Sequence, residues 1–236
     1  MNDPKTLTLL YDCIENDYSW RIVELSNFKN SVLQAKGKAQ EGMLRAGVAL
    51  LYAHWEGFVK YVAEQYYHFV SYQNHTIEEL SDCFVSIILR GELELLSNSN
   101  KLVQHNNIVQ IFFEKRSKKA FFSSKSPIQT SNLKFEVFED VCIMIGINLG
   151  EFRENYRSKD FDRDIQRTIN EDLVKKRNIV AHGQRLPINL EEYKDLYRIV
   201  VNGFLYVYKE QVMNAAQNKR YLRNSDVNIK DGILTL

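Results

Sequence analysis

The sequence of 236 residues predicts an all-α protein. Apolar residues recur every three or four positions along most of the chain, which is the period of a helix buried on one face. The chain holds only 3 prolines and 10 glycines, too few for the many tight turns of an all-β sandwich. Its content of 44% hydrophobic and 26% charged residues is that of an ordinary globular protein. We therefore expect about seven helices around one core.

Helices are expected over most of the first third of the chain. Apolar residues spaced by three or four predict one long or two short helices over 5–35, with a break at Gly37. The strongest helical pattern covers about 39–72, and its apolar stripe includes Trp55 and Phe58 as core residues. Small residues along its other side predict the close approach of a second helix: Gly42, Ala46, Ala49, Ala53 and Gly57.

The middle of the chain predicts shorter helices. Thr76 and Glu79 fit a capping box, which should open a helix reaching to about Leu96. Another helix is expected over 102–119. The segment 123–132 is rich in serine and threonine and holds a proline, so it predicts a linker.

The last third of the chain predicts three helices. The first is expected over about 133–146, and a turn follows at 147–152. The second runs over about 161–182, where Gly183 stands at the position of a C-terminal cap. The third starts after Asn189 and reaches about 221.

These elements predict one domain over 1–223. The segment 73–132 is expected to be a helical insertion within it. The C-terminal tail, 224–236, shows no helical stripe.

Charge, cysteine content and hydropathy exclude several classes of protein. The formal net charge is +1, so contact with nucleic acid must be local rather than driven by a global field. Cys13, Cys83 and Cys142 are odd in number and far apart, which fits neither a disulfide framework nor a zinc site. The chain shows no signal peptide and no charge-free run near the ~18 residues of a membrane span. We expect a cytoplasmic protein that binds no metal.

The helix over 161–182 ends in "LVKKRNIVAHGQ", residues 173–184. Arg177 stands four residues after Leu173, on the apolar stripe, where its charge must be paired or face a cleft. Asn178 and His182 lie together on the polar side. Arg177 and His182 are five residues apart and hence about 140° apart around an α-helix. The two side chains therefore do not share a face.

This helix end has two interpretations. Lys175, Lys176, Arg177 and His182 lie in the last turns, where cations offset the helix dipole. Alternatively, Arg177 and His182 act on a substrate. Spacing alone does not decide, because a chain with 5 histidines is expected to hold about one Arg-to-His pair of this kind by chance.

The surrounding sequence favours the second interpretation. The run RNIVAHG, residues 177–183, resembles the Arg-x4-His motif of the HEPN superfamily. The segment "LLYAHWEGFVK", residues 50–60, resembles part of the second helix in its MAE-type branch. The order of the two motifs agrees, and "PINLEEYKDLYRIVVNGF" resembles the long helix that follows in that family. The resemblance covers about 40–72 and 130–215.

The resemblance implies a HEPN-like helical bundle that cleaves RNA, such as tRNA or single-stranded RNA, as a symmetric homodimer without metal or cofactor. It makes His182 the general acid and base and Arg177 the group that stabilises the phosphorane, with Asn178 orienting the phosphate or the imidazole. One His182 from each subunit would supply both proton transfers. The family commonly acts as toxins or antiphage effectors held in check by an antitoxin or regulatory partner. The alternative is a HEPN-like module for dimerisation or protein binding without catalysis.

Other residues carry two interpretations each. Glu56 either pairs with Lys60 along its helix or holds Arg177 in place. His54 is expected to be packed and hydrogen-bonded rather than catalytic. In "FFEKRSKKAFF", residues 112–122, cations alternate with phenylalanines, as in a surface that binds an RNA backbone or in a solvated basic helix face. The candidate RNA-binding residues are Lys115, Arg116, Lys118, Lys119, Lys175 and Lys176.

Overall fold

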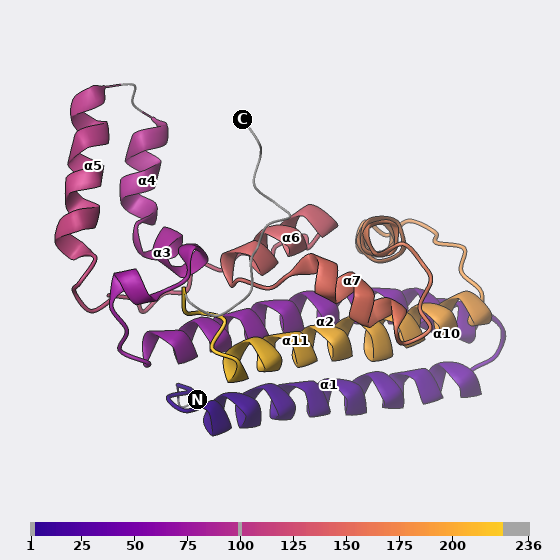
Figure 1. The fold of residues 1–236 in the computed structure, drawn as a ribbon. Helices are drawn as coiled ribbons and strands as arrows, with labels where there is room; N and C mark the ends of the chain where they lie inside the picture. Colours follow the sequence, from indigo (N-terminus) through magenta and orange to yellow (C-terminus); the bar gives the residue numbers. More distant parts are fainter. Residues whose placement is uncertain (1–2, 99–100, 224–236) are drawn as a thin grey trace.

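The computed structural model describes residues 3–98 and 101–223. These residues form nine helices, when contiguous α and π segments are joined, and no strand. The predicted all-α class is confirmed (Figure 1). The expectation for the tail 224–236 lies outside the described residues.

Three long helices run side by side (Figure 1). They are α1 (Leu7–Gln34), α2 (Gly37–Ser71) and a continuous helix made of α10 (Leu190–Arg198), η3 (Ile199–Leu205) and α11 (Tyr206–Gln217). The predicted break falls at Gly37, whose φ of 58° is one that a side chain disfavours. Asn189 begins the last helix as predicted, since its side chain accepts a hydrogen bond from the Glu192 N–H at 2.9 Å.

Trp55 lies at the centre of the core. Its side chain is fully buried, with ring centroids 5.0 Å from Phe138, 5.3 Å from Phe204 and 6.3 Å from Tyr208. Phe58 is also fully buried, so both residues occupy the core positions that the stripe predicts. Helix α2 therefore contacts the last long helix through its aromatic side chains.

The predicted seam of small residues on α2 is confirmed at Gly57, where a Cβ would lie 3.1 Å from Nη1 of Arg21 on α1, and is wrong at three other positions. Ala46 and Ala53 are exposed, and a Cβ added to Gly42 would meet nothing within 4 Å. A second close approach, which was not predicted, occurs at Gly47, where a Cβ would lie 2.6 Å from Cε2 of Tyr193. Periodicity identified small residues but not the face that a neighbouring helix covers.

The middle of the chain differs from the expected single helix between Thr76 and Leu96. The capping box is present, yet it opens only the short η1 (Ile77–Glu79), followed by α3 (Asp82–Ile88) and α4 (Arg90–Ser97). The helix stops because residues 79–81 pair with residues 221–223: the Ser81 N–H donates to Tyr221 O at 2.8 Å, and the Arg223 N–H donates to Glu79 O at 2.9 Å. Helix α5 (Leu102–Lys115) then ends earlier than predicted.

The segment after the linker adds α6 (Phe135–Met144) and α7 (Leu149–Arg157). The turn predicted at 147–152 is wrong beyond Asn148, whose side chain caps α7 by accepting from the Gly150 N–H at 2.7 Å. Among the described residues, no helix combines the length and the apolar character that crossing a bilayer requires.

Candidate active site

The helix that carries Arg177 and His182 has Asp164 as its N-cap. The Asp164 carboxylate accepts from the Arg167 N–H at 2.6 Å, so the helix starts at residue 165 rather than at 161. It comprises α8 (Ile165–Arg167), a π-helical η2 (Thr168–Lys175) and α9 (Lys176–Ala181).

Gly183 ends this helix, as predicted. Its φ is 69°, its N–H donates to Val180 O at 3.0 Å, and the next N–H, of Gln184, donates to Ile179 O at 2.9 Å. This pair of bonds satisfies the last carbonyl groups of the helix. His182 is therefore held at the C-terminal end, with its side chain exposed.

Arg177 faces α2. The centre of its guanidinium lies 4.1 Å from the ring centroid of Tyr52, a cation–π contact. Its Nη2 donates to Oδ1 of Asn132 at 3.2 Å and lies 3.9 Å from Oε2 of Glu56. Its Nε is buried and has no hydrogen-bond partner among the described residues. The guanidinium is therefore held in one orientation by contacts that use only part of its donors.

Tyr52 connects this arginine to the neighbouring loop. Its hydroxyl donates to Oε2 of Glu56 and accepts the buried N–H of Leu133 at 2.7 Å. Burial, together with the hydrogen bond to Glu56, raises the pKa of Tyr52 to about 12, so the hydroxyl keeps its proton at neutral pH. The ring supports Arg177, and the hydroxyl fixes the loop that carries Asn132.

Replacing Tyr52 with phenylalanine is expected to lower the free energy of unfolding by about 1–3 kcal/mol. The ring stays under Arg177, but the Leu133 N–H loses its buried acceptor. Urea titration measures this change. Tyr72→Phe is the control, because the Tyr72 hydroxyl donates to Asp3 at an exposed position. Equal effects of the two substitutions would contradict a special role for the Tyr52 hydroxyl.

His182 lies on a different side of the helix, in an open groove of about 590 Å³. Asn178, Lys175 and Lys134 line the groove with it, whereas Arg177 is not part of this lining. The separation of Arg177 from His182 thus follows the 140° expected for an i,i+5 pair. Lys175 is paired within the groove, its Nζ lying 2.6 Å from Oε2 of Glu171.

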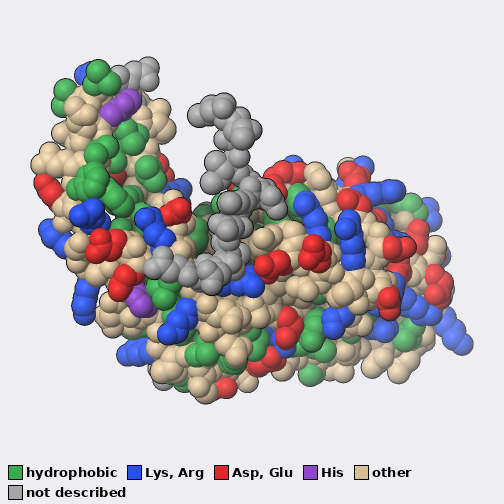
Figure 2. Space-filling view, viewed as in Figure 1, with side chains coloured by type: hydrophobic (Ala, Val, Ile, Leu, Met, Phe, Trp, Pro, Cys, Tyr) green, Lys and Arg blue, Asp and Glu red, His purple; other side chains and the backbone are tan. Residues whose placement is uncertain are grey.

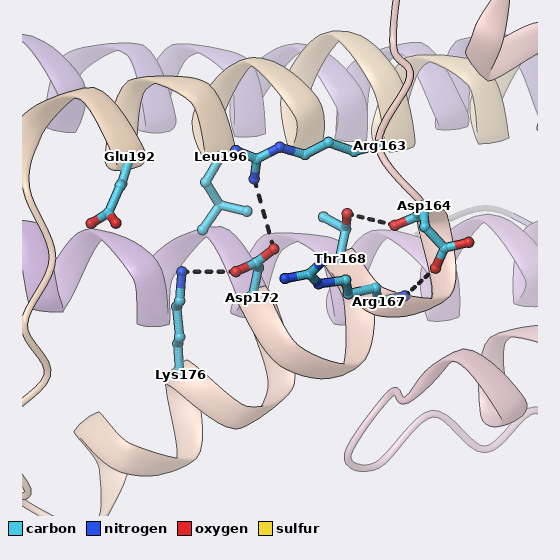
Figure 3. Close-up of a pocket in the computed structure, with 8 residues that line it drawn as sticks. All are labelled: Arg163, Asp164, Arg167, Thr168, Asp172, Lys176, Glu192 and Leu196. Carbon is cyan, nitrogen blue, oxygen red and sulfur yellow. Dashed lines mark hydrogen bonds and ion pairs between the residues drawn. The ribbon is translucent and has the colours of Figure 1, made fainter.

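Lys176 lies in a separate pocket of about 380 Å³ (Figure 3). Its Nζ is 2.8 Å from Oδ1 of Asp172, whose other oxygen lies 3.7 Å from Nη1 of Arg163. The two lysines therefore lie in different pockets, and each forms an ion pair with a carboxylate of its own helix.

The basic segment over 112–122 is not brought to this site. It lies near the C-terminal end of α2, where Phe122 packs against Tyr67, whereas Arg177 contacts the middle of that helix (Figure 1). Lys115 lies 2.8 Å from Oε1 of Glu92, and Arg116 lies 3.9 Å from Oε2 of Glu78. The RNA-binding role of the segment, with Lys118 and Lys119, stays a prediction.

His54 is buried, as the sequence analysis expects, and belongs to a cluster on α1 and α2. Its Nε2 lies 2.8 Å from Oε2 of Glu24, and its Nδ1 lies 3.5 Å from Nη1 of Arg21. Arg21 in turn donates to Asp17 at 2.6 Å, and its guanidinium fills the space beside Gly57. Burial and the charge of Arg21 lower the pKa of His54, against the opposing effect of Glu24.

The free energy of unfolding is expected to fall as the pH is lowered through about 6.5, the value for an unperturbed histidine. In the unfolded chain His54 binds a proton more readily than in the folded protein, so protonation favours unfolding below that pH. Urea titrations at pH 7.5 and 5.5 measure the loss. A His54→Gln variant should show a smaller loss over the same interval, and an unchanged loss would contradict this assignment.

Two contacts of Arg177 escaped the sequence analysis. Tyr52 stands four residues before Glu56 on α2, a spacing that puts both side chains on one face and was the available signal. Asn132 had no such signal, because it reaches Arg177 from a loop 45 residues away in the sequence. No group of three or more metal-binding side chains occurs among residues 3–98 and 101–223.

One comparison with known proteins gave a match. The sequence model of the family described as RiboL-PSP-HEPN matches residues 16–214, which includes both α2 and the helix that ends at Gly183. No curated protein and no solved structure matches the chain. The finer placement in the MAE-type branch stays a prediction.

Proposed function

Since the chain belongs to the RiboL-PSP-HEPN family of the HEPN superfamily, we propose that it is a metal-independent endoribonuclease. Its substrate class is RNA with an accessible 2′-hydroxyl, such as tRNA or single-stranded RNA. The products are a 2′,3′-cyclic phosphate and a 5′-hydroxyl. We expect it to act in the cytoplasm.

The observation that supports this proposal most is that the Arg177 guanidinium is held in place with part of its donors still free to bind a ligand. Its guanidinium is oriented by Tyr52, Asn132 and Glu56, yet within the described part of the chain these contacts use only part of its five N–H donors. A partly buried arginine with unused donors fits the non-bridging oxygens of a phosphate. An arginine that only capped its helix would need no such support from α2.

The chemistry needs two proton transfers. The 2′-oxygen attacks the adjacent phosphorus while one His182 imidazole removes the 2′ proton, and the bond from phosphorus to the 5′-oxygen breaks as a second imidazole protonates that oxygen. Arg177 stabilises the negative charge on the phosphorane. RNA supplies its own nucleophile, so no metal is required for attack.

A second copy of the chain would bring together functional groups that point apart within one chain. Arg177 faces α2, whereas His182 and Asn178 line the groove, so the two functional groups of one chain diverge. A symmetric homodimer with its motif helices facing each other would bring the Arg177 and His182 of two chains to one phosphate. Asn178 then orients the phosphate or the imidazole from the groove, and Glu56 keeps Arg177 in position.

The biological role follows from the family. HEPN nucleases commonly serve as toxins or antiphage effectors under the control of an antitoxin or regulatory protein, and we propose such a role here. The competing function is a module that only dimerises or binds a partner protein. The support of Arg177 by three side chains favours the nuclease.

The experiment is cleavage of tRNA and single-stranded RNA by the purified full-length protein in EDTA. A matched oligonucleotide carries a 2′-deoxynucleotide at the mapped cleavage site. Cleavage of the RNA with a cyclic phosphate end, and none of the deoxy-substituted strand at that position, is expected. Cleavage that requires a divalent cation would contradict the mechanism, and no cleavage of any RNA by a folded dimer would favour the binding module.

A further inference from the structure

The hairpin formed by α4 and α5 projects from the end of the long helices (Figure 1). Neither helix contains a fully buried residue. Isolated helices of 8 and 14 residues are marginal in water, so helices of this length depend on packing against another surface. Within one chain, the hairpin packs mainly on itself and on α3.

The outer face of α5 is apolar. Leu102, Val109 and Phe113 fall within about 20° of one direction around the helix, at positions i, i+7 and i+11. Their exposed fractions are 75%, 56% and 59%. Ile108 and Phe112, which are less exposed, lie on other sides of the same helix. The exposed stripe is therefore additional to the apolar positions that the chain itself covers.

Further exposed apolar side chains lie elsewhere on the two helices of the hairpin. Val103 on α5 and Leu93 and Leu95 on α4 are also exposed, and hydrophobic side chains gather over the hairpin in the space-filling view (Figure 2). The three side chains of the stripe leave roughly 400 Å² per chain accessible, the size of an apolar surface patch that is often functional. Exposed apolar surface of this extent marks an interaction site.

The charge of the hairpin indicates which partner fits. Between Leu95 and Phe113 the described residues carry one formal charge, that of Lys101. At its base, Arg90 lies 2.8 Å from Glu94, and Lys115 lies 2.8 Å from Glu92, so the flanking charges compensate one another. RNA would require a higher density of cations along this face. A nearly neutral apolar face can meet an identical face without like-charge repulsion.

We propose that the α4–α5 hairpin associates with the same hairpin of a second copy of this chain. Antiparallel pairing about a two-fold axis would pack the stripes of Leu102, Val109 and Phe113 against each other and form a four-helix arrangement. This interface is separate from the motif helices, because the hairpin lies beyond the C-terminal end of α2, whereas Arg177 contacts the middle of that helix (Figure 1). The hairpin interface can therefore be tested independently of the RNA-cleaving function.

Sedimentation equilibrium of the full-length chain at about 10 µM tests this interface. The double variant Val109→Glu/Phe113→Glu is expected to halve the mass of the wild-type assembly, from a dimer to a monomer or from a tetramer to a dimer. Val23→Glu is the matched control, because Val23 on α1 is 60% exposed and lies outside the hairpin. The control should keep the wild-type mass.

Three results would overturn the proposal: a monomeric wild type, an unchanged mass of the double variant, or an equal loss of mass in the control. Circular dichroism checks the helix content of each variant. If the glutamates reduce helicity, Leu102→Gln/Val109→Gln provides a milder change with residues that favour helices. This second variant should also halve the mass.

Discussion

Replacing His182 with alanine is expected to slow RNA cleavage by about 10²- to 10⁴-fold, the usual contribution of general acid–base catalysis. In a symmetric dimer one substitution removes both imidazoles, so the upper part of this range is expected. The fold should be unaffected, because the side chain is exposed and its backbone N–H still donates to Asn178 O. Single-turnover cleavage in EDTA, with enzyme in excess over RNA, measures the change.

His68→Ala is the control for this measurement, because His68 lies on α2 far along the helix from Tyr52 and Glu56. The control should retain wild-type cleavage. If His182→Ala cleaved at the wild-type rate, His182 would be neither acid nor base. The interpretation of His182 and the neighbouring cations as a helix cap would then be favoured.

Replacing Trp55 with alanine is expected to lower the free energy of unfolding by about 3–5 kcal/mol. The side chain is fully buried between α6 and the last long helix, so its removal leaves a cavity among Phe138, Phe204 and Tyr208. The indole N–H has no hydrogen-bond partner in the described part of the chain. Losing that unsatisfied donor offsets part of the cost, which puts the expected value nearer 3 kcal/mol.

Urea unfolding followed by circular dichroism measures this effect. Tryptophan fluorescence is not used, because the substitution removes one of the 2 tryptophans of the chain. Trp20→Ala is the control, because Trp20 is 48% exposed on α1. It should cost about 1 kcal/mol. A cost for Trp55→Ala no larger than that of the control would mean that the core tolerates the cavity by collapsing around it.

The sequence predicted the parts of the fold that depend on local periodicity. The stripe through Trp55, the break at Gly37 and the cap at Gly183 follow from residue type and spacing within a few turns. The helix expected from Thr76 was wrong because residues 79–81 pair with residues 221–223, far along the chain. A capping box specifies where a helix can start but not how long it continues.

The candidate site was predictable to the same extent. Arg177, Asn178 and His182 stand in one short motif, so their place at a helix end was available from sequence. Of the surroundings of Arg177, only Glu56 was proposed from sequence, because Asn132 comes from a loop with a positive φ of 56° and Tyr52 from a helix more than a hundred residues earlier. Tertiary contacts of this kind leave no local periodicity.

Helix α2 carries Trp55 of the core and Glu56 of the site at adjacent positions, with Tyr52 one turn earlier. Two of the three side chains that hold Arg177, Tyr52 and Glu56, are therefore part of a core helix, and only Asn132 reaches it from a loop. Hydrogen exchange of the backbone amides of residues 52–56 should proceed only through global unfolding. For the proposed nuclease, the support that Tyr52 and Glu56 give to Arg177 would then be lost only with the folded state, and a regulator would have to block access to the site rather than loosen this helix.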